Sequence, residues 1–280
     1  MDLGLYGILA RLALGLAVGV CVGMTGVGGG VLVIPLLTVV LGLPPSVAIG
    51  TASLNAFLTG IYATFRHLRL GTVDIRTALT FLVGAVPANL GASVLINHHL
   101  RALQSDPAAL LALQRDLRLA VTLVILFSAG ALLAKRFKRP RPESDGSKPA
   151  PAWVGGHPAR ARVTAVLSGA VVGALIGVTS IGGGILIVSI LLVLYGMPPS
   201  RTVGTTLMVT VSLSLLTAAV YGRGGSCDLR TALIMAAASP FGVYYGSRLA
   251  VRMPESALHG IVVGVVVAAA ALMLVSYAVR

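Results

Sequence analysis

Two glycine-rich stretches, each preceded by a hydroxyl residue, carry the strongest chemical signal in this sequence. They are TGVGGG at 25–30 and TSIGGG at 179–184. Each glycine in a helix costs roughly 1 kcal/mol relative to alanine, so both stretches predict a helix break. In lipid the freed backbone groups must be satisfied inside the protein, and N–H groups that begin the next helix can hold an anion. Two anion-binding breaks are therefore predicted, with two tight turns as the structural alternative.

Hydroxyl and amide side chains cluster near these stretches, at Thr51, Ser53, Asn55, Thr205, Thr206 and Thr210. They can cap helices and join them, or they can supply hydrogen-bond donors to a substrate. Asn55 and Asn89 are the more suggestive, because a buried amide in an apolar helix needs a partner. The predicted substrate site comprises Thr25, Gly26, Gly28, Gly29, Gly30, Thr51, Asn55, Thr179, Ser180, Gly182, Gly183, Gly184 and Thr205.

The acidic residues and cysteines do not indicate an enzyme. All eight carboxylates fall at the ends of apolar segments or between them: Asp2, Asp74, Asp106, Asp116, Glu143, Asp145, Asp228 and Glu255. No nucleophile is paired with a base, and Cys21 and Cys227 show no metal-ligand spacing. The glycines are not followed by Lys-Ser/Thr, which excludes a phosphate-binding P-loop. We expect neither catalysis nor a cofactor or metal.

The composition places these residues in a membrane. Apolar residues make up 56% of the 280 residues and charged residues 10%, and the mean hydropathy is +0.96. A water-facing surface needs roughly a quarter of its residues charged. The net charge of +13 sits in short gaps between apolar runs, which is typical of membrane helix ends and not of a nucleic-acid-binding face.

The apolar runs predict about ten helical segments, since a membrane helix needs about twenty mostly apolar residues. The first lacks an obvious A-x-A cleavage site, so we read it as a membrane helix. The region 97–116 is predicted to form a short surface helix, and the basic, Pro-containing region 135–161 a cytoplasmic linker. The predicted segments are 3–23, 28–42, 46–65, 75–96, 117–134, 162–178, 181–195, 202–221, 230–252 and 257–279.

The two halves of the sequence are copies of one unit. Residues 19–55 align without gaps to 173–209, at an offset of 154, with 15 of 37 residues identical. The same offset relates the elements that begin at Gly71 and Gly225. Such duplication is typical of transporters. We therefore divide the chain into a first transmembrane repeat at 1–134, the linker at 135–161, and a second repeat at 162–280.

The distribution of Lys and Arg does not decide how the repeats are oriented, because the mid-chain basic cluster dominates both the parallel and the inverted arrangement. Residues 3–42 are too long for one crossing at 1.5 Å per residue. They are better read as two passes or as a hairpin that returns to its starting side, and either leaves an odd number of crossings per repeat. The predicted fold is an all-α integral membrane protein with about eight to ten transmembrane helical segments in two repeats, and we favour inverted repeats.

Two further patterns predict structural roles. Glycines recur every fourth residue at Gly15, Gly19 and Gly23, and again at Gly169, Gly173 and Gly177, which allows close helix packing. The pairs Asp74/Arg76 and Asp228/Arg230 are predicted to cap and anchor helix starts, with a gating salt bridge as the alternative.

In combination, the paired G-x-T-x-x-G-G-G segments, the G-x-P-P-S turns followed by G-T, and the G-x-x-D-x-R elements resemble the sulfite exporter TauE/SafE family. The resemblance covers both halves of the chain and implies a carrier in the cytoplasmic membrane for sulfite, sulfonates, sulfoacetate or similar small anions. By position, it implies that 25–30 and 179–184 form the substrate region.

We therefore expect a secondary transporter that moves small anions by alternating access. The alternatives are an anion channel and a membrane structural or assembly protein. The expected partners are a small anion and the lipid bilayer, with no nucleic acid, and a homodimer is left open.

Overall fold

The computed structural model describes residues 4–25, 30–137, 158–181, 183–193 and 195–253, with a few isolated positions beyond them. These residues form helices and contain no strand, as the sequence predicts for an all-α protein. The helices are α1 (Leu5–Thr25), α2 (Gly30–Pro35), a π-helical segment (Leu36–Val40), α3 (Pro45–Arg69), α4 (Ile75–Ala102), α5 (Pro107–Phe137), α7 (Pro158–Thr179), α8 (Gly183–Val193), α9 (Pro199–Arg223) and α10 (Leu229–Arg252). The predicted last segment, 257–279, and most of the predicted linker lie outside the described residues.

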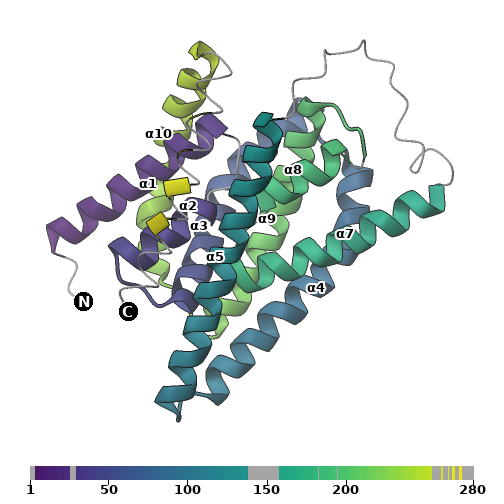
Figure 1. Ribbon diagram of the computed structural model, residues 1–280. Coiled ribbons are helices and arrows are strands. Elements are labelled where there is room, and N and C mark those ends of the chain that lie inside the picture. The colour runs from purple at the N-terminus through teal and green to yellow at the C-terminus, as the bar shows by residue number, and fades with distance from the viewer. Residues whose placement is uncertain are drawn as a thin grey trace.

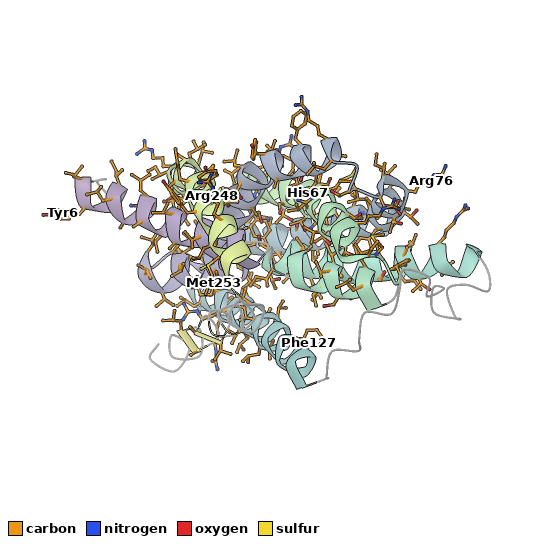
Figure 2. The ribbon with its side chains drawn as sticks, turned by 90° about the horizontal axis from the view of Figure 1, so that it is seen from above. Tyr6, His67, Arg76, Phe127, Arg248 and Met253 are labelled. Carbon is orange, nitrogen blue, oxygen red and sulfur yellow. The ribbon has the colours of Figure 1, made fainter. Side chains whose placement is uncertain are left out.

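The outer surface carries the apolar side chains that lipid requires. Within the described chain, five helices are long and apolar enough to cross a membrane: Leu5–Met24 in α1, α3, α4, Arg162–Thr179 in α7 and Arg201–Arg223 in α9. Tyr6 is 90% exposed and Phe127 is 65% exposed, and both lie at the periphery when the molecule is seen from above (Figure 2). A surface of this kind is stable in a bilayer and unfavourable in water.

The prediction of a separate surface helix at 97–116 is wrong. Helix α4 continues to Ala102 and α5 begins at Pro107, so only four residues separate two long helices. The carboxylate of Asp106 accepts hydrogen bonds from the backbone N–H groups of Ala108 and Ala109, which caps the start of α5. The Leu- and Ala-rich pattern belongs to the end of α4 and the start of α5, two long helices.

Glycines bring α1 and α10 into backbone contact, and the two helices lie side by side in Figure 1. Gly15 lies directly against the carbonyl oxygen of Met235, and Gly19 lies directly against that of Ser239. A Cβ atom at either glycine would overlap this backbone. Because both contacts advance by four residues in the same direction, α1 and α10 run parallel.

Helices α4 and α7 pack in the same way, on the other side of the molecule in Figure 1. Gly169 lies directly against the carbonyl oxygen of Phe81, and Gly173 against that of Ala85. All four residues stand 154 positions from their equivalents in the α1–α10 pair, since 169 − 15 and 235 − 81 are both 154. The predicted packing role of the glycines is therefore confirmed at the described contacts.

Helices α3 and α9 cross at the centre and run antiparallel. Gly50, near the start of α3, lies against Tyr221, near the end of α9. Gly204, near the start of α9, lies against Thr72, just past the end of α3. Helix α9 begins 154 residues after α3, and the two helices thus point in opposite directions.

Polar side chains join helices within this apolar protein. The amide nitrogen of Asn89 on α4 donates to the carbonyl of Gly173 on α7 at 3.2 Å and to the hydroxyl of Thr217 on α9 at 2.9 Å. The Thr217 hydroxyl donates back to the Asn89 amide oxygen at 3.1 Å. The buried amide that the sequence analysis singled out therefore ties three helices together.

Candidate functional site

The second glycine-rich stretch breaks the chain between α7 and α8. Helix α7 ends at Thr179, and Ser180 takes a left-handed conformation with φ of 54°. Residues other than glycine rarely adopt this left-handed backbone conformation, so the backbone is strained at the break. The Thr179 hydroxyl accepts a hydrogen bond from the N–H of Ile181 at 3.2 Å, which partly satisfies the freed backbone.

The described part of the first break contacts the second. Gly30, the first residue of α2, lies directly against the carbonyl oxygen of Ser180, and a Cβ atom there would overlap it. A side chain at Gly30 would therefore push the two breaks apart, so glycine is required at this position.

A pair of hydroxyls marks the place where the second break meets α3. The buried Ser53 hydroxyl donates a hydrogen bond to the Ser180 hydroxyl, and the two oxygens are 2.7 Å apart. Because Ser180 accepts this bond, its own proton can be donated to a ligand. Ser180 is half-buried, whereas Ser53 is fully buried.

Helix α9 adds two further hydroxyls to this region. Thr206 and Thr210 lie one turn apart on α9, and the hydroxyl oxygen of each is buried without a hydrogen-bond partner in the described part of the chain. The Thr210 hydroxyl would be 2.8 Å from a Cβ atom at Gly183, the first residue of α8. Buried hydroxyls normally have partners, so a ligand near the start of α8 would satisfy an otherwise unmet requirement.

The first residues of α8 supply backbone donors at the same place. Gly183 and Gly184 are buried, and the first N–H groups of a helix have no acceptor within that helix. Together with the Ser180 hydroxyl, they can surround the oxygens of a small anion without a cationic side chain.

Asn55 is buried but lies away from this hydroxyl pair. Its side chain is 1% exposed, and its amide oxygen has no hydrogen-bond partner within the described chain. Residues two apart on a helix do not share a face, so Asn55 does not point the same way as Ser53. Its predicted contact with substrate stays a prediction.

Thr51 and Thr205 are held at two loops and do not join the break. The Thr51 hydroxyl accepts from the backbone N–H of Asp228 at 2.9 Å, and the Thr205 hydroxyl accepts from that of Asp74 at 3.0 Å. Thr205 also donates to the carbonyl of Arg201 at 2.7 Å. These bonds give both threonines a structural role, and we leave them out of the site.

The remaining predicted site residues belong to the first break and to one position of the second. Gly26, Gly28, Gly29 and Gly182 lie outside the described residues. Thr25 ends α1, and only its backbone is described. Their predicted roles stay predictions.

The aspartates that begin α4 and α10 act as caps, as predicted. Asp74 accepts from the N–H of Thr77 at 3.1 Å, and Asp228 accepts from the N–H of Thr231 at 3.0 Å. Burial by itself raises the pKa of Asp228, but the hydrogen bonds from Thr231 and the nearby Arg11 guanidinium outweigh burial and hold the pKa below its ordinary value. These carboxylates are committed to helix starts and do not form a proton path through the described chain.

Ser53 and Thr210 are the residues that sequence reasoning did not place in the site. Both belong to the hydroxyl cluster found in the sequence, but the repeat offered no reason to choose them. Their equivalents 154 positions away are Leu207 and Ala56, so the hydroxyls occur in one copy each. The presence of each hydroxyl in only one of the two copies was the signal in the sequence that could have drawn attention to Ser53 and Thr210.

The family profile described as sulfite exporter TauE/SafE matches residues 11–273, almost the whole chain. This chain belongs to the sulfite exporter TauE/SafE family. It is thus a multi-pass membrane transporter, as the motifs predicted, and not an enzyme.

Relatives of this TauE/SafE protein align over nearly full length. A probable membrane transporter protein of Bacillus subtilis, YjnA, is 30% identical, over 90% of this chain and 94% of its own. A probable membrane transporter protein of Xylella fastidiosa strain Temecula1 is 29% identical, over 97% of this chain and 96% of its own. No solved structure matches this family member.

Proposed function

We propose that this TauE/SafE protein is a secondary carrier that moves small anions by alternating access, with sulfur oxyanions or organosulfonates such as sulfite or sulfoacetate as substrates. The substrate would lie at the break between α7 and α8. There the Ser180 hydroxyl, the Thr210 hydroxyl and the first N–H groups of α8 would hold its oxygens.

One observation carries this proposal. The Ser53–Ser180 hydroxyl pair lies at a strained helix break, and the buried Thr210 hydroxyl, which has no partner in the described chain, lies against Gly183 at the start of the next helix. A purely structural turn would not require unpaired hydroxyls, because each costs roughly 1–3 kcal/mol when buried. A bound anion accounts for both the break and the hydroxyls.

The proposed alternating access rests on two inverted repeats, 1–134 and 162–280, joined by the linker 135–161. The antiparallel crossing of α3 and α9 supports the inversion, because these two helices occupy equivalent positions 154 residues apart. The loop glycines agree with the repeat: φ is 67° at Gly71 and 74° at its equivalent Gly225. Inverted repeats can exchange conformations about a fixed central site, which gives inward-open and outward-open states.

The test is uptake of radiolabelled sulfite and of sulfoacetate into proteoliposomes that contain the purified protein. We expect saturable uptake by the wild-type protein and at least a tenfold loss of kcat/KM in the variant Ser180→Ala, since a lost hydrogen bond to an anion costs about 1.5–3 kcal/mol. Ser212→Ala is the matched control, because the Ser212 hydroxyl bonds only the Met208 carbonyl of its own helix in the described structure.

The outcomes separate the proposal from its alternatives. Uptake that does not saturate with anion concentration indicates a channel. Correctly folded protein without uptake of any sulfur anion indicates a structural role, or another solute. If Ser180→Ala and Ser212→Ala lose uptake to the same extent, the break is not the substrate site.

A further inference from the structure

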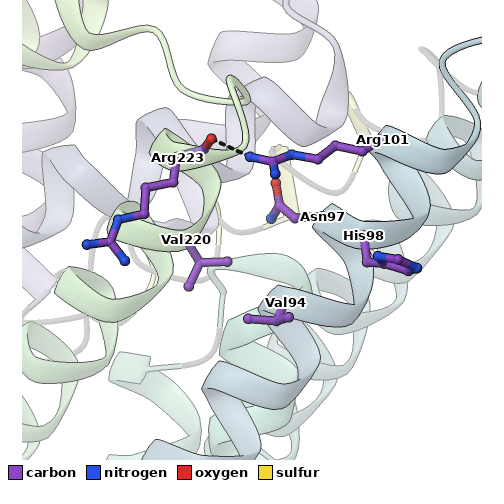
Figure 3. A pocket seen from close by; sticks show the side chains of 6 residues that line it. All are labelled: Val94, Asn97, His98, Arg101, Val220 and Arg223. Atoms are coloured by element: carbon purple, nitrogen blue, oxygen red, sulfur yellow. Dashed lines mark hydrogen bonds between the residues drawn. The ribbon is translucent and has the colours of Figure 1, made fainter.

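A pocket of about 270 Å³ opens between α4 and α9, near their C-terminal ends (Figure 3). It is separate from the break between α7 and α8. The residues that line it are Val94, Asn97, His98, Arg101, Val220 and Arg223.

A contact between a side chain and the backbone links the two arginines of the pocket. The Arg101 guanidinium on α4 donates a hydrogen bond to the carbonyl of Arg223, the last residue of α9 (Figure 3). Below it, the buried Asn97 amide oxygen lies directly against Gly224, where a Cβ atom would overlap it. Glycine at 224 therefore lets α9 end against α4, with both arginines at one opening.

No acidic residue of the lining balances the positive charge of the pocket. Its lining includes two arginines and one histidine, and none of its lining residues is acidic. A helix C-terminus favours one cation in its last turn, but this effect does not account for a hollow that holds both arginines and a histidine. An anion at this opening would balance the positive charge of the two arginines.

The pocket is distinct from the substrate region but connected to it by buried polar groups. Ser93 and Tyr221 both donate to the carbonyl of Gly177, three residues before Ser180. Arg101 lies eight residues beyond Ser93 on α4, which corresponds to about 12 Å along a helix. The two places can therefore bind ligands independently.

We propose that this pocket binds one oxyanion group, of the phosphate or sulfonate class, between Arg101 and Arg223. Guanidiniums match the planar pairs of oxygens that such groups present. The group can come from a free anion in water or from the headgroup of an anionic phospholipid. The second source is compatible with Val94, which is 53% exposed on the adjoining apolar surface.

The experiment measures binding to the full-length protein in two arms. In the first, inorganic phosphate and methanesulfonate are titrated calorimetrically into protein in a neutral detergent at low ionic strength. In the second, phosphatidylglycerol retained by the protein is measured by native mass spectrometry after reconstitution in mixed phosphatidylglycerol and phosphatidylcholine. The variant is Arg101→Gln/Arg223→Gln, and the matched control is Arg230→Gln, an exposed arginine in the first turn of α10 that does not line the pocket.

We expect the double variant to weaken binding at least about tenfold in one of the two arms, with Arg230→Gln within twofold of wild type. Loss in the detergent arm identifies a free anion as the ligand, and loss confined to the lipid arm identifies a headgroup. Binding that is equal in wild type and double variant in both arms would overturn the proposal, as would absence of binding in both.

The proposal stands apart from the proposed function. Neither arm measures transport, and Ser180→Ala should leave the Arg101-dependent binding unchanged. Failure of the pocket to bind would not affect the break, and a protein that transports no sulfur anion can still hold an oxyanion here.

Discussion

Thr51 accepts a hydrogen bond at 2.9 Å from the backbone N–H of Asp228, so a residue of the first sequence copy holds the start of a helix in the second. Thr205 does the same for Asp74, in the opposite sense. Each half of the protein thus completes a helix start that belongs to the other half. These two hydrogen bonds join the halves of the chain at two loops on opposite ends of the molecule.

The variant Thr51→Val should lower the free energy of unfolding by about 1 kcal/mol, because the Asp228 N–H loses its acceptor while the side chain keeps its shape. Thr205→Val should have an effect of similar size. Thermal unfolding in detergent measures both. Thr80→Val is the control, since the Thr80 hydroxyl bonds an exposed carbonyl of its own helix, and it should change little.

Gly19→Leu should prevent α1 from packing on α10, because the new side chain would occupy the place of the Ser239 carbonyl. We expect a loss of about 2 kcal/mol or more, with a lower yield of folded protein. Gly91→Leu on α4 is the control, because a Cβ atom there meets nothing within 4 Å. A normal yield of Gly19→Leu measured by size-exclusion chromatography would contradict the observed helix contact.

Asn89 and Thr217 should show an energetic coupling of roughly 0.6–1.7 kcal/mol, in the range measured for hydrogen bonds between membrane helices. The measurement is a double-mutant cycle with Asn89→Leu, Thr217→Val and the double variant, read by unfolding free energy. Asn89 also donates to Gly173, so Asn89→Leu alone should be the more destabilising single change. Strict additivity of the two changes would show that the pair does not interact.

Two substitutions of Ser180 distinguish the effect of backbone strain from the effect of losing the hydroxyl. Ser180→Gly should be more stable than Ser180→Ala by about 1 kcal/mol, because glycine adopts φ of 54° without strain. Both variants should lose anion uptake to the same extent, since both lack the hydroxyl. Uptake retained in Ser180→Gly would mean that the backbone conformation, and not the hydroxyl, is what the substrate needs.

The proposed inverted repeats predict that the loop before α4 and the loop before α10 face opposite sides of the membrane. In a background with Cys21 and Cys227 replaced by alanine, Leu70→Cys and Arg230→Cys should react with a membrane-impermeant maleimide from opposite sides. Both positions are exposed. Labelling of both from the same side would favour parallel repeats.

The helices could be predicted from the sequence because each is a long apolar run bounded by glycine, proline or charge. The glycine ladder could be predicted for a similar reason, since residues four apart share a helix face whatever lies opposite. The error at 97–116 has the same origin, because Leu- and Ala-rich segments are equally suited to a surface helix and to the end of a long membrane helix.

Partners across the molecule could not be predicted. The bond between Ser53 and Ser180 joins residues 127 apart in sequence, and the bond between Thr51 and Asp228 joins residues 177 apart. A hydroxyl on a helix face has the same appearance in sequence whether it meets a break, a loop or lipid. For this reason the sequence identified the cluster of hydroxyls but could not show that Thr51 and Thr205 bond two loops or that Ser53 bonds Ser180.

The packing of α1 on α10 has a consequence for biosynthesis. The Ser239 hydroxyl that bonds the Gly15 carbonyl is made 224 residues later. At ordinary translation speeds of about 5–20 residues per second, that delay is on the order of 10–40 s. Throughout this interval the first helix resides in the bilayer with its glycine face towards lipid or towards a temporary companion. Helix α1 is therefore synthesised long before α10, the helix on which it packs.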